Sequence, residues 1–277
     1  MHRYVFIIIA ILLSAFSQTP GEKPHHRTPA PQAKQQAGAD IPPMPDFTSI
    51  ADVREKKKAF ISYLLPLIKE ANTRVIAERQ LVERWYLEGD DLSDDDKEEI
   101  QQLLTKYRIT SEDTDEQKEL LLRRVNVIPP SLVLAQAANE SGWGTSRFAQ
   151  EGNNLFGQWC FREGCGLVPE ARGGSSRHEV RRFNSPLDSV ESYIRNLNSH
   201  PQYRDLRDLR LKSLEDNGNV TGEELIPGLI GYSELGEDYT DLIRNMIEYN
   251  KLNRFDNGQP NKPVQATNTS GGSSASQ

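Results

Sequence analysis

An apolar run in the middle of the chain leads directly into a glutamate and two glycines, and this order constrains the fold more than any other feature. Residues 132–138 (LVLAQAA) follow a Pro-Pro-Ser start, which predicts a short buried helix whose alanines allow close packing. Gly142 and Gly144 permit backbone conformations that other residues avoid, so the chain can turn sharply where the helix ends. We therefore expect Glu140 to project from the end of a buried helix into a cleft.

Glu140 in such a position has two properties that suit a general acid. Trp143 can supply an apolar wall, which disfavours the carboxylate and raises its pKa. The partial negative charge at a helix C-terminus opposes ionisation in the same way. Periodicity alone favours a simpler interpretation, in which Glu140 is a solvated residue after a buried helix, and the sequence around it decides between the two.

The charge balance excludes several classes of protein. The chain has 277 residues, with 33 Lys and Arg against 40 Asp and Glu, which gives a formal net charge of −7. A chain this acidic lacks the basic surface that binds nucleic acid, and its mean hydropathy of −0.65 excludes a polytopic membrane protein. It contains no glycine-rich phosphate loop, HExxH helix or GxSxG elbow, so nucleotide hydrolysis, zinc proteolysis and serine hydrolysis are not favoured.

Residues 1–17 have the pattern of an export signal or an N-terminal anchor. A basic start is followed by an apolar run over residues 4–16, which is too short for an ordinary spanning helix. Ala15 and Ser17 suit a cleavage site, and no cysteine follows for lipid attachment. We expect an exported protein of the periplasm or cell envelope and favour cleavage, with membrane contact only through this segment if it stays uncleaved.

Composition divides the rest of the chain into four parts. Residues 18–45 and 257–277 hold almost nothing to bury, so we expect a disordered linker and a disordered tail. Residues 46–127 carry apolar side chains at helical spacing and form a predicted helical extension, with a kink or break at Pro66. Residues 128–256 form the remaining domain.

Start signals place further elements along the chain. Ser93 precedes three aspartates that suit the positive end of a helix dipole. Capping boxes open two more helices, at Ser185 and at Thr221. Another helix is predicted through residues 239–247, and a hairpin is predicted with its turn near residues 173–174 and its second strand over residues 179–183. The whole reads as mainly α with one inserted hairpin.

Two motif blocks resemble the mannosyl-glycoprotein endo-β-N-acetylglucosaminidase-like domain of glycoside hydrolase family 73, a family of peptidoglycan hydrolases. They are residues 135–144 (AQAANESGWG) and 153–157 (NNLFG). The order of later motifs agrees, with residues 183–186 (FNSP), 189–193 (SVESY), 231–233 (GYS), Tyr203 and Tyr239. The resemblance covers residues 129–252, and the long helical extension, together with the stretches 197–200 (LNSH) and 232–234 (YSE), is similar to the Bax-type branch of exported bacterial proteins.

The resemblance implies a lysozyme-like helical fold with a β-hairpin lobe and a groove between them for the glycan strand of peptidoglycan. Glu140 takes the position of the general acid, which protonates the leaving oxygen of a β-1,4 bond. The next step needs either a carboxylate that activates water or the substrate's own N-acetyl group. Glu170 and Glu179 compete for the carboxylate role, and we prefer Glu179, on the second strand, while substrate assistance stays open.

Further site residues follow from the same resemblance. Tyr232 matches the family's Gly-Tyr element and is expected to position the N-acetyl group or water, although the residues after it, 233–238, depart from the family's pattern. In the second motif, Asn154 offers hydrogen bonds and Phe156 offers a ring for sugar stacking, although Phe156 is equally suited to the core. The residues expected to bind substrate are Trp143, Asn154, Phe156 and Tyr239.

Cys160 and Cys165 are the two cysteines of the chain, and in an exported protein they predict a local disulfide. His178 has no partner at zinc-like spacing, so we expect no metal, and no cofactor is implied. We expect a monomer that cleaves the glycan strand. Two rivals are a cell-wall binding or scaffolding module without turnover, and an amidase, which would use zinc or a Cys-His pair that the sequence does not offer.

Overall fold

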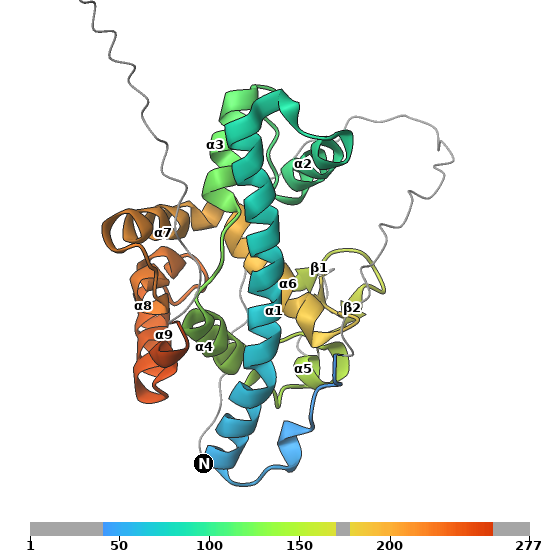
Figure 1. The fold of residues 1–277 in the computed structure, drawn as a ribbon. Helices are drawn as coiled ribbons and strands as arrows, with labels where there is room; N and C mark the ends of the chain where they lie inside the picture. Colours follow the sequence, from blue (N-terminus) through green and yellow to red (C-terminus); the bar gives the residue numbers. More distant parts are fainter. Residues whose placement is uncertain (1–40, 170–177, 257–277) are drawn as a thin grey trace, which may run out of the picture.

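The computed structural model describes residues 41–169 and 178–256, which form a mainly helical fold with one small antiparallel sheet (Figure 1). The expected export signal, the linker up to residue 40 and the tail from residue 257 lie outside the described residues. In the described part of the chain, no helix is long and apolar enough to span a membrane. The α-helices are α1 (Val53–Glu88), α2 (Asp94–Lys106), α3 (Thr114–Arg124), α4 (Pro130–Ser141), α5 (Arg147–Gly152), α6 (Pro186–Ser199), α7 (Arg204–Asn217), α8 (Gly222–Leu225) and α9 (Glu237–Tyr249).

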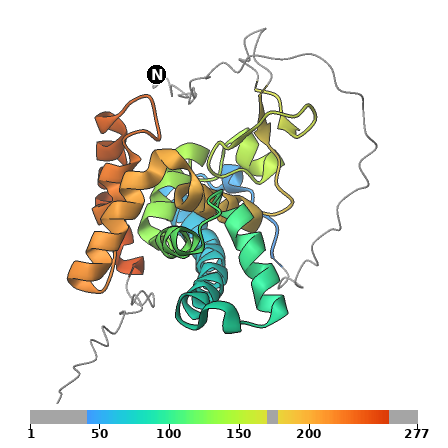
Figure 2. The ribbon, with the colours of Figure 1, turned by 90° about the horizontal axis from the view of Figure 1, so that it is seen from above.

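Helix α1 is the central element of the fold. Figures 1 and 2 show α7, α8 and α9 on one side of α1 and the small sheet on the other. The buried side chains of α1 belong to the same continuous hydrophobic core as those of α4, α6 and α9. The structure confirms the mainly α, lysozyme-like fold with a β lobe, and it joins the helical extension to the later domain through one core.

The expected break at Pro66 is wrong, because the 36-residue helix α1 continues through this proline. A proline inside a helix removes one backbone hydrogen bond and costs about 3 kcal/mol. The buried stripe of α1, which includes Leu64, Leu67 and Ile68 around the proline, keeps the helix packed on the core. Burial of this stripe therefore outweighs the local cost.

The helix starts agree with the sequence signals. The Ser93 side chain accepts a hydrogen bond from the backbone N–H of Asp96, at the start of α2. The Ser185 and Thr221 capping boxes both form, at the starts of α6 and α8. Helix α8 is shorter than a typical helix and continues as a 3-10 helix over Ile226–Leu229.

The sheet has three short strands, β1 (Trp159–Cys160), β2 (Gly166–Leu167) and β3 (Glu179–Arg181), in the order β1-β3-β2. Antiparallel β2 and β3 form the expected hairpin, and β1 is an additional strand on the other edge of β3. Strand β3 ends at Arg181, two residues earlier than expected. The expected turn at residues 173–174 lies outside the described residues.

Buried polar contacts fix both ends of the segment that carries α4. Arg210 of α7 is buried and donates hydrogen bonds to backbone oxygens of residues 123–127 and to the Asn198 side chain, and this burial lowers its pKa to about 9. At the start of α4, the Asp256 carboxylate accepts from the backbone N–H and the hydroxyl of Ser131. Asn198 belongs to the LNSH stretch, so that motif has a packing role here.

Candidate active site

Helix α4 ends at Ser141, one residue beyond the end expected at Glu140, with Gly142 in the left-handed conformation (φ 58°). The Ser141 hydroxyl donates to the Ala137 carbonyl and accepts from the backbone N–H of Gly144, which closes the turn. Gly144 also has a positive φ of 77°, and a Cβ atom there would lie 2.5 Å from the Phe47 ring. The two glycines therefore allow the sharp turn directly after Glu140.

The Glu140 carboxylate is held by hydrogen bonds at one oxygen. Its Oε1 accepts from the Tyr239 hydroxyl at 2.8 Å and from the Asn139 side-chain amide at 3.1 Å. Among the described residues, no hydrogen bond reaches Oε2. Burial raises the pKa of Glu140 above its ordinary value, and the two hydrogen bonds to Oε1 oppose that rise only in part. Oε2 is thus the oxygen that is free to carry and donate a proton.

Tyrosines form the apolar surroundings of Glu140. Tyr239 stacks on Tyr232 with ring centroids 5.2 Å apart, and Tyr203 lies 6.2 Å from Tyr232. The Glu140 charge contributes, after burial, to raising the pKa of these three tyrosines and of Tyr193. The structure therefore brings Glu140, Tyr232 and Tyr239 together as expected, but the Tyr239 hydroxyl is bonded to the Glu140 carboxylate and Tyr239 does not line the groove described below.

Gln136 is a site residue that the sequence analysis missed. It lies one helical turn before Glu140 on α4 and is fully buried. Its Nε2 donates to the Tyr239 hydroxyl at 2.8 Å, and its Oε1 accepts from the Tyr193 hydroxyl. Gln136 thereby orients the hydroxyl that holds Glu140. The available signal was a glutamine inside an apolar helix, four residues before the glutamate.

Tyr203, Tyr232 and Tyr239 form a tyrosine layer around Glu140, and a groove with a volume of about 340 Å³ reaches this layer. Its walls come from the turn after α2, the loop before β1, strand β3, helix α6 and the segment after it, and the residues before α9. Phe156 and Tyr232 line it, as the resemblance implies. Other lining residues are Arg108, Gly157, Gln158, Trp159, Phe161, Arg181, Ser192, Arg195, Asn196, His200, Gln202 and Tyr203.

Trp143 takes a different position from the expected one. Its ring packs edge-on against Phe60 of α1 at 5.6 Å, and the Lys57 ammonium lies 4.8 Å from the ring centroid. Trp143 is not among the residues that line the groove. The apolar wall beside Glu140 is built by tyrosines, and Trp143 instead attaches the turn after α4 to α1.

Asn154 also has a different task from direct substrate contact. It is buried, its Nδ2 donates to the carbonyls of Gln158 and Arg181, and its Oδ1 accepts from the backbone N–H groups of Phe156 and Gln158. All its hydrogen-bonding capacity is used inside the protein. It holds the loop that carries Phe156, whose ring stacks on Tyr193 with centroids 4.0 Å apart.

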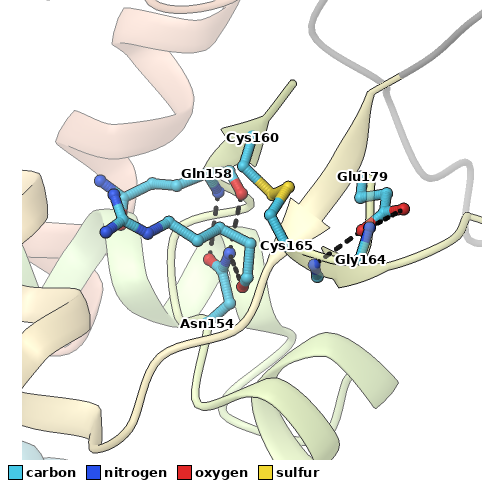
Figure 3. Close-up of a disulfide and its surroundings, with 8 residues drawn as sticks. Asn154, Gln158, Cys160, Gly164, Cys165 and Glu179 are labelled. Atoms are coloured by element: carbon cyan, nitrogen blue, oxygen red, sulfur yellow. Dashed lines mark hydrogen bonds between the residues drawn. A yellow bond between two sulfur atoms is a disulfide. The ribbon is translucent and has the colours of Figure 1, made fainter. Parts of the chain in front are cut away.

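The expected disulfide between Cys160 and Cys165 is present, next to the preferred second carboxylate (Figure 3). Glu179 is buried, and its two oxygens accept from the backbone N–H groups of Gly164 and Gly166 at 3.0 and 2.7 Å. Its carboxylate thus holds the disulfide turn and is not among the groove-lining residues. Glu170, the other candidate, lies outside the described residues.

One cluster of metal-ligand residue types occurs in residues 41–169 and 178–256. It consists of Cys160, Cys165 and Glu179, whose ligand atoms lie within 4.8 Å of one another. The two sulfurs are bonded to each other in the disulfide, and the carboxylate is held by backbone amides. This donor set does not fit a metal ion, because a disulfide sulfur is not a thiolate ligand.

Comparison with known proteins agrees with this geometry. The family model for mannosyl-glycoprotein endo-beta-N-acetylglucosaminidase matches residues 117–252. Protein bax of Escherichia coli (strain K12) is 30% identical over 269 residues, which cover 91% of this chain and 96% of that protein. The chain belongs to the Bax-type branch of the glucosaminidase family. No solved structure matches it.

The similarity to known proteins extends beyond the residues of the glucosaminidase model to the helical extension before them. The family model begins within α3, so α1 and α2 precede the matched residues. The similarity to the Bax protein extends over nearly the whole chain, and the structure packs α1 into the core of the glucosaminidase domain. The Bax-type extension is therefore part of the same folded unit.

Proposed function

We propose that this protein is an exported peptidoglycan hydrolase that cleaves β-1,4 glycosidic bonds of the glycan strand, as an endo-β-N-acetylglucosaminidase, with Glu140 as general acid. The observation that carries this proposal is the position of the Glu140 carboxylate beside a groove lined with aromatic rings, where burial raises the pKa of the carboxylate. Export follows from the signal-like first residues, and the family membership supports a glycan substrate.

The proposed reaction begins with proton transfer from Oε2 of Glu140 to the glycosidic oxygen. The bond between C1 and that oxygen breaks, the leaving sugar departs with the proton as an alcohol, and positive charge develops at C1. Tyr239 holds the other oxygen of Glu140, so the carboxylate that remains keeps its orientation. Water finally adds to C1, and the proton that this water loses restores the acid.

The second group in the reaction is the N-acetyl carbonyl of the substrate or the carboxylate of Glu170. Glu179 is less suited to this role than the sequence suggested, because backbone amides hold both of its oxygens. Tyr232 lines the groove next to Tyr239, where its hydroxyl is suited to orient an N-acetyl group or a water molecule. The comparison of Glu170→Gln with wild type separates the two routes.

The direct test incubates the full chain, wild type and Glu140→Gln, with purified peptidoglycan and identifies soluble fragments by mass spectrometry. We expect wild type to release fragments that end in reducing N-acetylglucosamine, and Glu140→Gln to release none while it keeps the same circular dichroism. Near-full activity of Glu140→Gln would refute the assignment. Fragments ending in another sugar would keep a glycosidase and change the bond that is cut.

A second candidate function is a cell-wall binding module without turnover. The observation that favours it is the groove lining, which contains no aspartate or glutamate among the described residues. Such a module would release no fragments in either form of the protein but would sediment with insoluble peptidoglycan. The same incubation, followed by centrifugation, therefore distinguishes the two candidates.

A further inference from the structure

Three arginines from separate parts of the fold meet at the groove beside the tyrosine layer. Arg108 lies in the turn between α2 and α3, Arg181 lies on β3, and Arg195 lies on α6. All three side chains are exposed, and all three line the groove. Within residues 41–169 and 178–256, none of them forms an ion pair.

The charge of this groove differs from that of the whole chain. The chain carries a formal net charge of −7, yet the described residues that line the groove include three arginines and no carboxylate. His200 lies in the same lining, and burial, followed by the charges of Arg108 and Arg207, lowers its pKa, which disfavours its charged form. The arginines, whose guanidinium groups keep their charge, therefore supply the positive charge of the groove.

Arg108 has an unusual backbone conformation, which a contact with Arg124 stabilises. It has a φ of 58°, which non-glycine residues rarely adopt. The Arg124 guanidinium donates to the carbonyls of Tyr107 and Arg108 at 2.7 and 2.9 Å, and this contact fixes the turn. Arg108 precedes the residues that the family model matches, so the helical extension supplies one wall of the groove.

Aromatic side chains share the groove with these arginines. Phe161 is 74% exposed, and Trp159 is half-buried with one ring face stacked on His178, so these two rings are available to stack on sugar rings, whereas the lining residues Phe156 and Tyr203 are buried. Rings together with unpaired guanidinium groups suit a ligand that has both sugar faces and carboxylates. A neutral glycan would leave the arginine charges without a partner.

We infer that Arg108, Arg181 and Arg195 bind carboxylates carried by the glycan strand, so that the groove selects an acidic, substituted strand over a neutral one. This inference rests on the proposed function and specifies its substrate. The carboxylates come from the lactyl ether of the sugar or from its peptide stem. The helical extension, through Arg108, is on this basis part of the substrate site.

The test measures binding to the full-length Glu140→Gln protein, so that no ligand is cut. Three soluble ligands of equal sugar length are titrated: a strand with peptide stems, the same strand with stems removed, which frees the lactyl carboxylates, and a neutral N-acetylglucosamine oligomer. Arg108→Gln, Arg181→Gln and Arg195→Gln are added singly and together. Arg182→Gln is the matched control, since Arg182 is exposed beside Arg181 but does not line the groove.

Each single substitution is expected to weaken binding of the stem-bearing strand roughly two- to fivefold, and the triple variant more than tenfold, as for exposed ion pairs. The neutral oligomer should bind all variants equally, and Arg182→Gln should bind every ligand like its parent. Loss for the stem-free strand alone identifies the lactyl carboxylate as the partner, because this group is an amide in the stem-bearing strand. Loss for the stem-bearing strand alone identifies the carboxylates of the stem, and loss for both shows that the arginines accept either source.

Equal loss for all three ligands, or no loss for any, would overturn the inference. Absence of binding to every ligand would overturn it as well. The outcome is separable from that of the proposed function. Arginine-dependent binding by a protein that releases no fragments would keep the inference and refute catalysis, whereas fragment release with unchanged binding of the triple variant would do the reverse.

Discussion

Tyr239 on α9 donates a hydrogen bond of 2.8 Å to Oε1 of Glu140 on α4. The two residues are 99 positions apart in the sequence, so the orientation of the proposed acid depends on the packing of two distant helices. Gln136 donates to the same tyrosine hydroxyl and thereby sets its direction. Tyr239 is in this way a positioning residue, because it acts through Glu140.

Tyr239→Phe tests that relationship through the pH dependence of activity. The hydrogen bond from Tyr239 lowers the pKa of Glu140, against the larger effect of burial, so its removal raises this pKa further. A general acid works while protonated, so the decline of kcat/KM on the alkaline side should move to higher pH. We expect kcat to fall roughly tenfold, the usual cost of losing a hydrogen bond to a charged group.

Tyr249→Phe is the control for this experiment, because Tyr249 lies on the same helix and is 80% exposed. It should leave both kcat and the pH profile unchanged. An alkaline limb that stays in place in Tyr239→Phe, with only the rate reduced, would show that Tyr239 does not set the ionisation of Glu140.

Glu140→Gln should also change stability, in a manner that depends on pH. The folded-state pKa of Glu140 is raised above the unfolded value, which is about 4.3, so ionisation costs more in the folded state. Below the unfolded pKa both states are protonated and no cost arises. As pH rises through the folded pKa, wild type loses stability relative to the variant, which cannot ionise.

At pH 7.5 we expect the free energy of unfolding of Glu140→Gln to exceed that of wild type by roughly 0.5–2 kcal/mol, a common gain when a destabilising functional residue is replaced. This difference should vanish near pH 3.5. Urea unfolding at the two pH values measures this difference. Glu248→Gln, on the exposed surface of α9, serves as the control and should show no such change. A variant that is less stable than wild type at pH 7.5 would contradict the argument.

Glu179→Gln should affect folding more than turnover. Its carboxylate accepts from two backbone N–H groups in the disulfide turn, and a glutamine places an amide donor toward one of them. We expect a loss of about 1–3 kcal/mol in the free energy of unfolding and a kcat within a few-fold of wild type. Glu163→Gln, exposed in the same turn, should change neither quantity. A kcat reduced a thousandfold in a protein of normal stability would instead make Glu179 the catalytic base.

Local signals in the sequence predicted much of the fold. Capping residues at Ser93, Ser185 and Thr221 and the glycine at residue 142 act over three or four residues, and the structure has a helix boundary at each. Pro66 was misjudged because the packing of α1 on distant helices decides whether a proline breaks it. Tertiary contacts of this kind leave no trace in a local pattern.

In the candidate site, too, some features follow from local sequence and others depend on tertiary contacts. The position of Glu140 at the end of a buried helix follows from the residues next to it. The roles of Trp143, Asn154 and Glu179 depend on what lies opposite them: α1 for the first, backbone carbonyls and amides for the other two. A motif says which residues occur together, but the direction in which each side chain points is set by elements far away in the sequence.

Gly144→Ala tests whether contact with the N-terminal segment fixes the turn after Glu140. Gly144 has a φ of 77°, and a Cβ atom there would lie 2.5 Å from Phe47 Cδ2 and 3.1 Å from Phe60 Cδ2. Gly157→Ala is a matched control, since Gly157 has a φ of 64° and no atom within 4 Å of such a Cβ. The free energy of unfolding of the control should fall by about 1 kcal/mol through backbone strain alone. That of Gly144→Ala should fall by roughly 2–4 kcal/mol, because overpacking adds to the strain. Equal losses in urea unfolding would mean that Phe47 moves aside freely, and the turn that carries Glu140 would then not depend on it.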